Sequence, residues 1–248
     1  MSEHQSKERL QQLSALVGGL AHEIKNPLST ININLELLRE DWHHDGGPLA
    51  SRSIRKIDVL LQESRRLEGM LTEFIRLTST AELDPSIVDI NVLLEDVLDF
   101  TAAECRNRNI QITSQLDRSL PRVELDPNLI RQVVLNLLKN SFEAMEERGG
   151  TITVNTRRKA AGSDSELRVV IEVIDNGSGI TPESQKRVFQ AYFSTKAEGT
   201  GLGLPSVQKI VERHGGRISC ESAPGLGTRF VVELPARQPS APAPDEGP

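Results

Sequence analysis

Apolar positions in the first third of the chain recur in steps of three and four residues, as on one side of a helix. From about residue 6 to about residue 40, a seven-residue spacing predicts one long helix with a narrow packing seam. The seam consists of Leu10, Val17, Ile24, Ile31 and Leu38. A turn at 45–48 precedes a second helix that is predicted to reach about residue 79. Two helices bury little apolar surface by themselves, so we expect an antiparallel hairpin that pairs with a second copy into a dimeric four-helix bundle.

The pattern changes near Leu83, Asp84 and Pro85, where proline and polar residues predict a linker. We expect the stretch 80–88 to act as a hinge. Beyond it, helical and strand periods alternate. Helices are predicted over 91–105, with Asn91 as the cap, over 126–146, with Asp126 as the cap, and over 182–189 and 204–214. Strands are predicted over 110–116, 151–157, 167–174, 216–221 and 228–234.

These elements predict an α/β sandwich that follows the helical hairpin, with one mixed sheet and helices on one of its faces. The chain as a whole is therefore expected to be of the α+β class. We expect residues 1–82 to form the hairpin domain and residues 88–235 to form the sandwich domain. Residues 236–248 are rich in proline and alanine and are predicted to be a disordered tail.

Composition narrows the possible functions of this chain of 248 residues. A net charge of -6 and an aromatic content of 3% argue against nucleic-acid binding, which needs positive charge and stacking side chains. No long apolar run predicts a membrane segment, and the polar N-terminus does not resemble a signal peptide, so we expect a cytoplasmic protein. Cys105 and Cys220 are expected to be reduced thiols.

His22 lies on the side of the first predicted helix that faces away from the seam. With Ile24 at heptad position a, His22 falls at position f, where its imidazole meets solvent. Glu23 is adjacent, and Asn26 lies one turn further on. Neutral imidazole is a nucleophile near pH 7, and a neighbouring carboxylate can fix its tautomer or take its proton. A lone exposed histidine is usually only a solvated side chain, so the surrounding residues decide between the two interpretations.

Three glycine-containing stretches in the second half are candidates for a phosphate-binding surface. They are 175–179, which follows a predicted strand, 199–204, which opens a predicted helix, and 225–228, which precedes the last strand. Glycine lets backbone approach a ligand, and a helix N-terminus attracts anions. The spacing of glycines in 199–204 also occurs in Rossmann turns, but a predicted loop precedes it here, where a Rossmann turn requires a strand.

Asn136 and Asn140 lie one turn apart on the helix predicted over 126–146. Each amide can present an oxygen, and Mg²⁺ prefers oxygen ligands that it shares with substrate phosphates and water. Taken alone, the two amides are more typical of buried residues that cap a helix or bridge a core. The histidine, the amides and the glycines become specific only when they are considered together.

The string GLAHEIKNPLS at 19–29 resembles the H-box of sensor histidine kinases. The second half resembles the ATP-binding domain that these kinases share with Hsp90-type chaperones, gyrase-type topoisomerases and mismatch-repair MutL proteins. Residues 132–145 match the N-box, 175–179 the G1 box, 189–193 the F-box and 199–204 the G2 box. Glu143 and Ala144 depart from the common end of the N-box, and the lid between Phe193 and Gly199 is short, as in the NtrB-like subgroup.

The resemblance implies a role for each matched residue. His22 accepts the phosphoryl group, Glu23 assists its activation, and Asn26 positions water for dephosphorylation of the partner. Asp175 accepts a hydrogen bond from adenine, supported by Thr228, while Asn140 ligates Mg²⁺ beside Asn136. The remaining nucleotide contacts are implied for Lys139, Gly177, Gly179, Lys196, Gly199, Thr200, Gly201, Leu202, Gly203 and Leu204. Among these, Lys196 in the lid is the candidate for the terminal phosphate of ATP.

The function implied is that of a two-component histidine kinase. It would use ATP and Mg²⁺ to phosphorylate His22 and would pass the phosphoryl group to an aspartate on a response regulator receiver domain. A phosphatase activity toward that regulator is a further expectation. Only about twenty residues precede His22, so we expect either a separate sensor protein or a fragment of a longer chain. The alternatives are an ATPase of the same fold and a degenerate kinase that acts as a scaffold.

Overall fold

The structure is a computed structural model that describes Ile24 and residues 28–40, 48–78, 82–145, 148–161, 166–196 and 199–236. The chain divides into two compact units, Met1–Ala81 and Glu82–Pro248. Each unit is described by itself. Among the described residues, none of the helices has the length and hydropathy needed to cross a bilayer.

The first unit is a pair of antiparallel helices. Ile24 and residues 28–40 are helical, and α2 spans Pro48–Thr78. Residues later in the first helix contact residues earlier in α2, as an antiparallel hairpin requires. Asn32 Nδ2 donates to Glu68 Oε1 at 3.2 Å, and Arg39 lies 3.5 Å from the Asp58 carboxylate. Residues 45–47 of the predicted turn at 45–48 and the start of the first predicted helix lie outside the described residues.

Apolar side chains of the hairpin fall into two groups. Ile57 and Leu61 are buried between its helices. Ile31 and Leu38, which belong to the predicted seam, remain 50% and 46% exposed. Two helices can cover only one side of each other, so the seam is left uncovered by the hairpin itself.

The second unit is built on a five-stranded mixed sheet with the order β2-β4-β5-β7-β6. The β2–β4 pair is parallel, and the other neighbouring pairs are antiparallel. Its strands are β2 (Ile110–Gln115), β4 (Gly150–Ala161), β5 (Glu166–Asp175), β6 (Arg217–Ala223) and β7 (Gly227–Pro235). This sheet confirms the predicted sandwich. It places the last residue of β5 opposite the beginning of β7.

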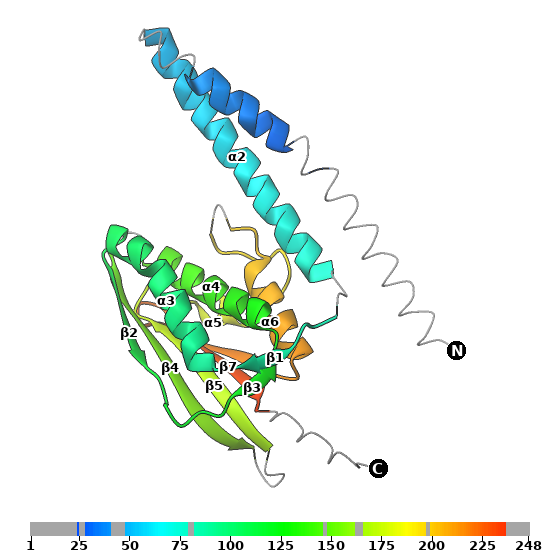
Figure 1. The fold of residues 1–248 in the computed structure, drawn as a ribbon. Helices are drawn as coiled ribbons and strands as arrows, with labels where there is room; N and C mark the ends of the chain where they lie inside the picture. The colour runs from blue at the N-terminus through cyan, green and yellow to red at the C-terminus, as the bar shows by residue number, and fades with distance from the viewer. Residues whose placement is uncertain are drawn as a thin grey trace, which may run out of the picture. The chain divides into compact units, whose positions relative to one another are not determined.

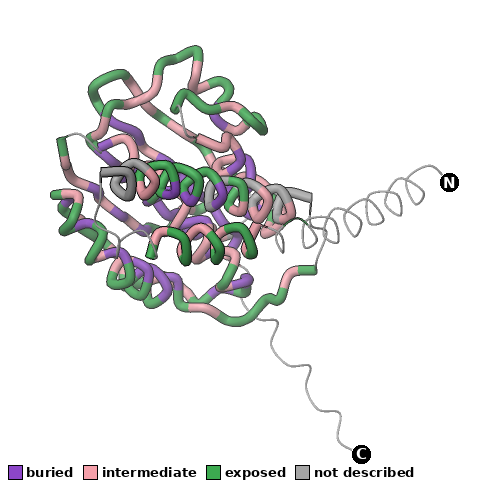
Figure 2. Tube along the Cα trace, turned by 90° about the horizontal axis from the view of Figure 1, so that it is seen from above, coloured by how far each residue is buried: buried purple, intermediate pink, exposed green. Residues whose placement is uncertain are grey.

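Three helices cover one face of this sheet (Figure 1). They are α3 (Ile90–Asn107), α4 (Pro127–Ala144) and α6 (Gly203–Arg213). Buried positions gather where the helices meet the sheet (Figure 2). The side of α4 that faces the sheet is fully buried and consists of Val133, Val134, Leu137 and Leu138. The opposite side of α4 therefore faces away from the core. The core is almost entirely aliphatic, in line with the low aromatic content.

Two aspartates begin the long helices. Asp126 caps α4, as predicted, by accepting from the backbone N–H groups of Asn128 and Leu129. The prediction that Asn91 caps α3 is wrong, because Asp89 accepts from the N–H groups of Asn91 and Val92. Asn91 already lies in the first turn, and its side chain donates to the carbonyl of Asp117.

Three further elements differ from the predictions. The predicted hinge 80–88 contains a strand, β1 (Ser86–Val88), which pairs antiparallel with the unpredicted strand β3 (Val123–Leu125). Both strands have three residues, which is too short to give a period. The helix predicted over 182–189 is shortened to α5 (Pro182–Gln185), and turns follow it.

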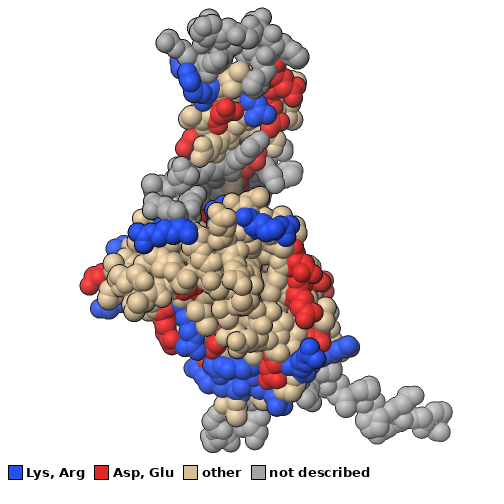
Figure 3. Space-filling model, turned by 90° about the vertical axis from the view of Figure 1, so that its left-hand side faces the viewer, with Lys and Arg blue, Asp and Glu red and all other residues tan. Residues whose placement is uncertain are grey.

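The sheet face that the helices leave uncovered carries two buried carboxylates, Glu172 and Glu233. Arg157 and Arg229 lie 3.2 and 2.7 Å from Glu172, and Lys159 and Arg217 lie 2.7 and 2.8 Å from Glu233. Each buried charge is therefore compensated by two cations. On the face of this unit drawn in Figure 3, uncharged residues occupy the middle, and positive and negative side chains lie around them.

Candidate functional site

Asp175, the last residue of β5, is the buried centre of the candidate site, with 4% of its surface exposed. Its Oδ1 accepts from the backbone N–H groups of Gly177 at 2.9 Å and Thr228 at 3.2 Å. Its Oδ2 accepts from Ser141 Oγ at 3.0 Å. A carboxylate oxygen can accept two hydrogen bonds, so Oδ1 is filled and Oδ2 retains room for one further donor.

Burial raises the pKa of the Asp175 carboxyl above its usual value. The hydrogen bonds from Gly177, Ser141 and Thr228 and the positive charge of Lys196 oppose this rise. Three donors thus hold the carboxylate in a fixed orientation. They do not fully replace the hydration that the carboxylate loses on burial, so its pKa stays raised. A ligand that brings one more N–H donor to Oδ2 would stabilise the charged form.

Thr228 lies directly opposite Asp175 in the β5–β7 register and is buried. Its hydroxyl is 3.0 Å from Ser222 Oγ, and Ser222 also accepts from the N–H of Ile180 at 2.8 Å. Gly227 has φ +89° and approaches the carbonyl of Asp175 so closely that a Cβ atom would lie 1.9 Å from it. The position of Thr228 beside Asp175 is therefore fixed by hydroxyl hydrogen bonds and by the close approach of Gly227 to the backbone of Asp175.

Two amides lie on α4, the helix that also carries Ser141. Asn136 and Asn140 are half-buried, and Lys139 between them is exposed. Ser141, which follows Asn140, is buried and reaches Asp175. Within the described part of the chain, the side chains of Asn136 and Asn140 have no hydrogen-bond partner, so both amide oxygens are available to a ligand. Such oxygens fit Mg²⁺, which takes few protein ligands and completes its shell with phosphates and water.

The glycines of 175–179 and 199–204 differ in whether the surrounding structure leaves room for a side chain. A Cβ at Gly177 would lie 2.8 Å from Ala144, and one at Gly179 (φ +70°) would lie 2.0 Å from the carbonyl of Ala223. Gly201 (φ +66°) would meet the backbone of Tyr192 and Phe193 at 2.6–2.8 Å. At Gly203 a Cβ would have no neighbour within 4 Å. The fold itself requires the first three glycines, whereas none of the described residues requires the fourth.

Residues 199–204 lead into α6 as predicted. Thr200 and Gly199 are half-buried, and Thr200 Oγ1 accepts from the N–H of Leu202 at 3.3 Å. Leu202 is buried and is the N-cap residue of α6, while Leu204 packs against the core. Among the described residues, no side chain caps α6, so its first N–H groups can face an anion.

Lys196 is exposed and forms an ion pair with Glu143, one turn beyond Asn140 on α4. The ion pair ties the lid to the helix that carries the two amides. It also gives Glu143, which departs from the common N-box, a structural role. The positive charge of Lys196 also stabilises the Asp175 carboxylate, and so it opposes the rise in the pKa of Asp175 that burial causes.

Several residues of the site carry no signal in the sequence taken alone. Ser141, Glu143 and Ser222 come together with Asp175, Lys196 and Thr228 only through the packing of α4, β6 and the lid. The position of Ser141 directly after Asn140 is the one clue that the sequence offers. The predicted phosphoacceptor residues His22, Glu23 and Asn26 lie outside the described residues.

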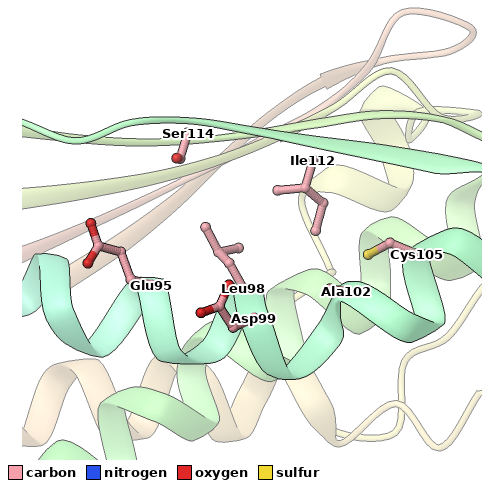
Figure 4. A pocket seen from close by; sticks show the side chains of 7 residues that line it. All are labelled: Glu95, Leu98, Asp99, Ala102, Cys105, Ile112 and Ser114. Carbon is pink, nitrogen blue, oxygen red and sulfur yellow. The ribbon is translucent and has the colours of Figure 1, made fainter.

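A separate cavity of about 500 Å³ opens between α3 and the edge strand β2 (Figure 4). Leu98, Ala102 and Ile112 contribute apolar surface, and Glu95 and Asp99 lie on α3 beside them. It shares no lining residue with the site around Asp175, and the sheet order places β4 between β2 and β5.

Comparisons with known proteins agree with this geometry. Residues 12–83 match the family described as His Kinase A (phospho-acceptor) domain. Residues 125–238 match the family described as Histidine kinase-, DNA gyrase B-, and HSP90-like ATPase. The chain is 38% identical over 234 residues to sensor histidine kinase ZraS of Salmonella typhi, which covers 94% of this chain and 48% of that protein. It thus spans about half the length of the curated relatives it matches.

Two solved structures are similar along most of the chain. ThkA in complex with response regulator protein TrrA is 28% identical with a TM-score of 0.66, over 95% of this chain and 65% of that one. Full-length ShkA in complex with AMPPNP is 24% identical with a TM-score of 0.70, over 92% of this chain and 47% of that one, and supports the fold alone. With both family matches in the expected order, the chain belongs to the sensor histidine kinases, whose phosphoacceptor domain is followed by an ATPase-type domain.

Proposed function

We propose that this chain binds ATP beside Asp175 and transfers the γ-phosphoryl group to His22. The observation that carries the proposal is the buried Asp175 carboxylate, whose Oδ2 keeps one acceptor position free of donors from the described residues. Two amides of α4 without a partner among those residues, and the start of α6, which no described side chain caps, support it. This set of groups matches a purine with an exocyclic amine at one end and a charged phosphate chain at the other.

Each end of the nucleotide has its own partners in this proposal. Asp175 Oδ2 accepts from the adenine amine, and Thr228 supports that contact. Gly201, Gly203 and the first turn of α6 lie along the phosphates, with Lys196 at the terminal one. Asn140 and Asn136 would hold Mg²⁺, which neutralises phosphate charge. The residues 88–235 form the catalytic domain in this scheme.

Residues 1–82 supply the acceptor. The neutral imidazole of His22 attacks the γ-phosphorus, an N–P bond forms, and the bond to the bridging oxygen breaks so that ADP leaves. Glu23 takes the imidazole proton or holds the tautomer that frees the attacking nitrogen. Asn26 positions water when the partner is dephosphorylated. This assignment to His22 rests on the sequence and the family match.

We further propose a homodimer and a response regulator receiver domain as partners. The exposed seam residues Ile31 and Leu38 support the dimer, because a second hairpin would cover them. ThkA, whose complex contains a response regulator, supports the receiver domain. The phosphoryl group of His22 then passes to an aspartate of that domain.

The proposal is tested with labelled ATP and Mg²⁺. We expect label that is lost in acid and survives base, as phosphohistidine requires. His22→Gln should abolish the label and leave the affinity for ATP unchanged, whereas the matched variant His44→Gln should label normally. Acid-labile label on His22→Gln would remove His22 from its role. A wild-type chain that binds ATP but does not become labelled would favour the scaffold alternative.

A further inference from the structure

Asp126 joins three segments that are far apart in the sequence. Its Oδ1 caps α4 by accepting from the N–H groups of Asn128 and Leu129 at 3.0 and 3.1 Å. Its Oδ2 accepts from the N–H of Asp84 at 3.2 Å. Its own N–H donates to His214 Nε2, directly after α6, at 3.1 Å. The residue is 7% exposed, so these bonds are shielded from water.

The tautomer of His214 follows from these contacts. A backbone N–H can only donate, so Nε2 must be the unprotonated nitrogen of a neutral ring. The proton then lies on Nδ1, which is 2.8 Å from the carbonyl of Ile210, an acceptor. His214 is thereby fixed to α6 on one side and to Asp126 on the other.

The contact with Asp84 anchors the linker that leaves the hairpin. The helix α2 ends at Thr78, and β1 begins to pair with β3 at Ser86. The bond from Asp84 to Asp126 therefore fixes this linker just before β1 begins. It also fixes the linker to the residue from which α4 starts, and α4 carries Asn136 and Asn140.

We propose that Asp126 is a positioning residue for phosphoryl transfer, which couples the linker to the nucleotide-binding helices α4 and α6. The inference rests on the function proposed above. A transfer step depends on the distance and angle between donor and acceptor. The covalent path between His22 and the nucleotide domain runs through this linker, so the point where it is anchored limits how the domain can approach the acceptor.

Two variants separate coupling from capping. Asp126→Asn keeps a good cap residue but offers one oxygen instead of two, so either α4 or Asp84 loses its acceptor. Asp84→Pro removes the linker donor and leaves the cap of α4 intact, at an exposed position that already precedes Pro85. Asp89→Asn is the matched control, because Asp89 caps α3 through the same pair of contacts and is exposed.

Three quantities are measured for each variant: the Kd of a fluorescent ATP analogue, the autophosphorylation rate at saturating ATP, and the Tm. We expect Asp126→Asn and Asp84→Pro to change the Kd by less than about twofold and to lower the rate about fivefold or more. Asp89→Asn should change neither. His214→Gln, whose amide oxygen can accept the N–H of Asp126, should keep more of the rate than His214→Ala.

A rate that is unchanged or raised in Asp84→Pro would overturn the coupling role. A loss of ATP affinity equal to the loss of rate would reduce Asp126 to a structural cap. If the wild-type chain itself is not labelled on His22, the proposed function fails and the coupling role fails with it. A labelled wild-type chain with insensitive variants contradicts the coupling role alone.

Discussion

The hydroxyl of Ser141 on α4 donates a 3.0 Å hydrogen bond to Oδ2 of Asp175 at the end of β5. The bond crosses from the helix layer to the sheet and joins the two elements that carry the proposed adenine and Mg²⁺ contacts. Asp175 Oδ2 is also the oxygen with room for one more donor. The orientation of the proposed adenine acceptor therefore depends on α4.

Ser141→Ala tests this dependence. Loss of the hydroxyl leaves Oδ2 without its protein donor and frees the carboxylate to rotate, so we expect ATP affinity to fall by about 1 kcal/mol, roughly fivefold. Calorimetric titration with ATP measures it. Ser219→Ala, on the exposed face of β6, is the control and should bind ATP as the wild type does. Equal affinities for the wild type and Ser141→Ala would show that the hydroxyl does not hold the acceptor.

Gly201 and Gly203 should respond differently to alanine. At Gly201 the positive φ and the backbone of Tyr192 leave no room, so Gly201→Ala should lower the free energy of unfolding by about 2 kcal/mol or more. At Gly203 the space is open, so Gly203→Ala should fold as stably as the wild type. If phosphates approach the backbone there, its ATP affinity should still fall by about tenfold. Urea unfolding and ATP titration measure the two effects, and unchanged ATP binding by Gly203→Ala would place the phosphates elsewhere.

Lys196 should distinguish ATP from ADP. Its ion pair with Glu143 is partly exposed and contributes little stability, so Lys196→Ala should unfold like the wild type. If Lys196 meets the terminal phosphate, the variant should lose about tenfold in affinity for ATP and little for ADP. Competition titrations with both nucleotides measure the ratio. Lys186→Ala, an exposed lysine after α5, should leave it unchanged. Equal losses for ATP and ADP would assign Lys196 to another part of the nucleotide.

Acid should destabilise the second unit through His214. Burial lowers the pKa of this imidazole below its ordinary value of 6.5, and Arg213 lowers it too, while the bond to Ile210 and the charge of Asp126 oppose the shift. The unfolded chain then binds the proton more readily. The stabilisation is therefore complete above pH 6.5 and is lost as the pH falls toward the depressed folded pKa.

Urea unfolding at about pH 7.5 and about pH 5.5 measures this loss. His214→Gln does not titrate in this range and should show a smaller fall in stability between the two pH values. The same fall in both proteins would assign the acid sensitivity to other groups.

The sequence by itself determined the family, the long helices and five strands of the sheet, because helical and strand periods are local properties of the chain. It also predicted Asp175, Asn136, Asn140 and the glycines as candidate site residues, since their chemistry is visible in the residue types and their order. The positions of β1 and β3 escaped it, because strands of three residues carry no readable period.

Only the tertiary structure decided which side chains serve these residues. Ser141 and Glu143 are ordinary polar residues until the packing of α4 brings them to Asp175 and Lys196. His214 lies 88 residues from Asp126, and nothing local links the two. Hydrogen bonds of this kind depend on where the aliphatic core places the helices, and that placement is a property of the whole fold rather than of any segment.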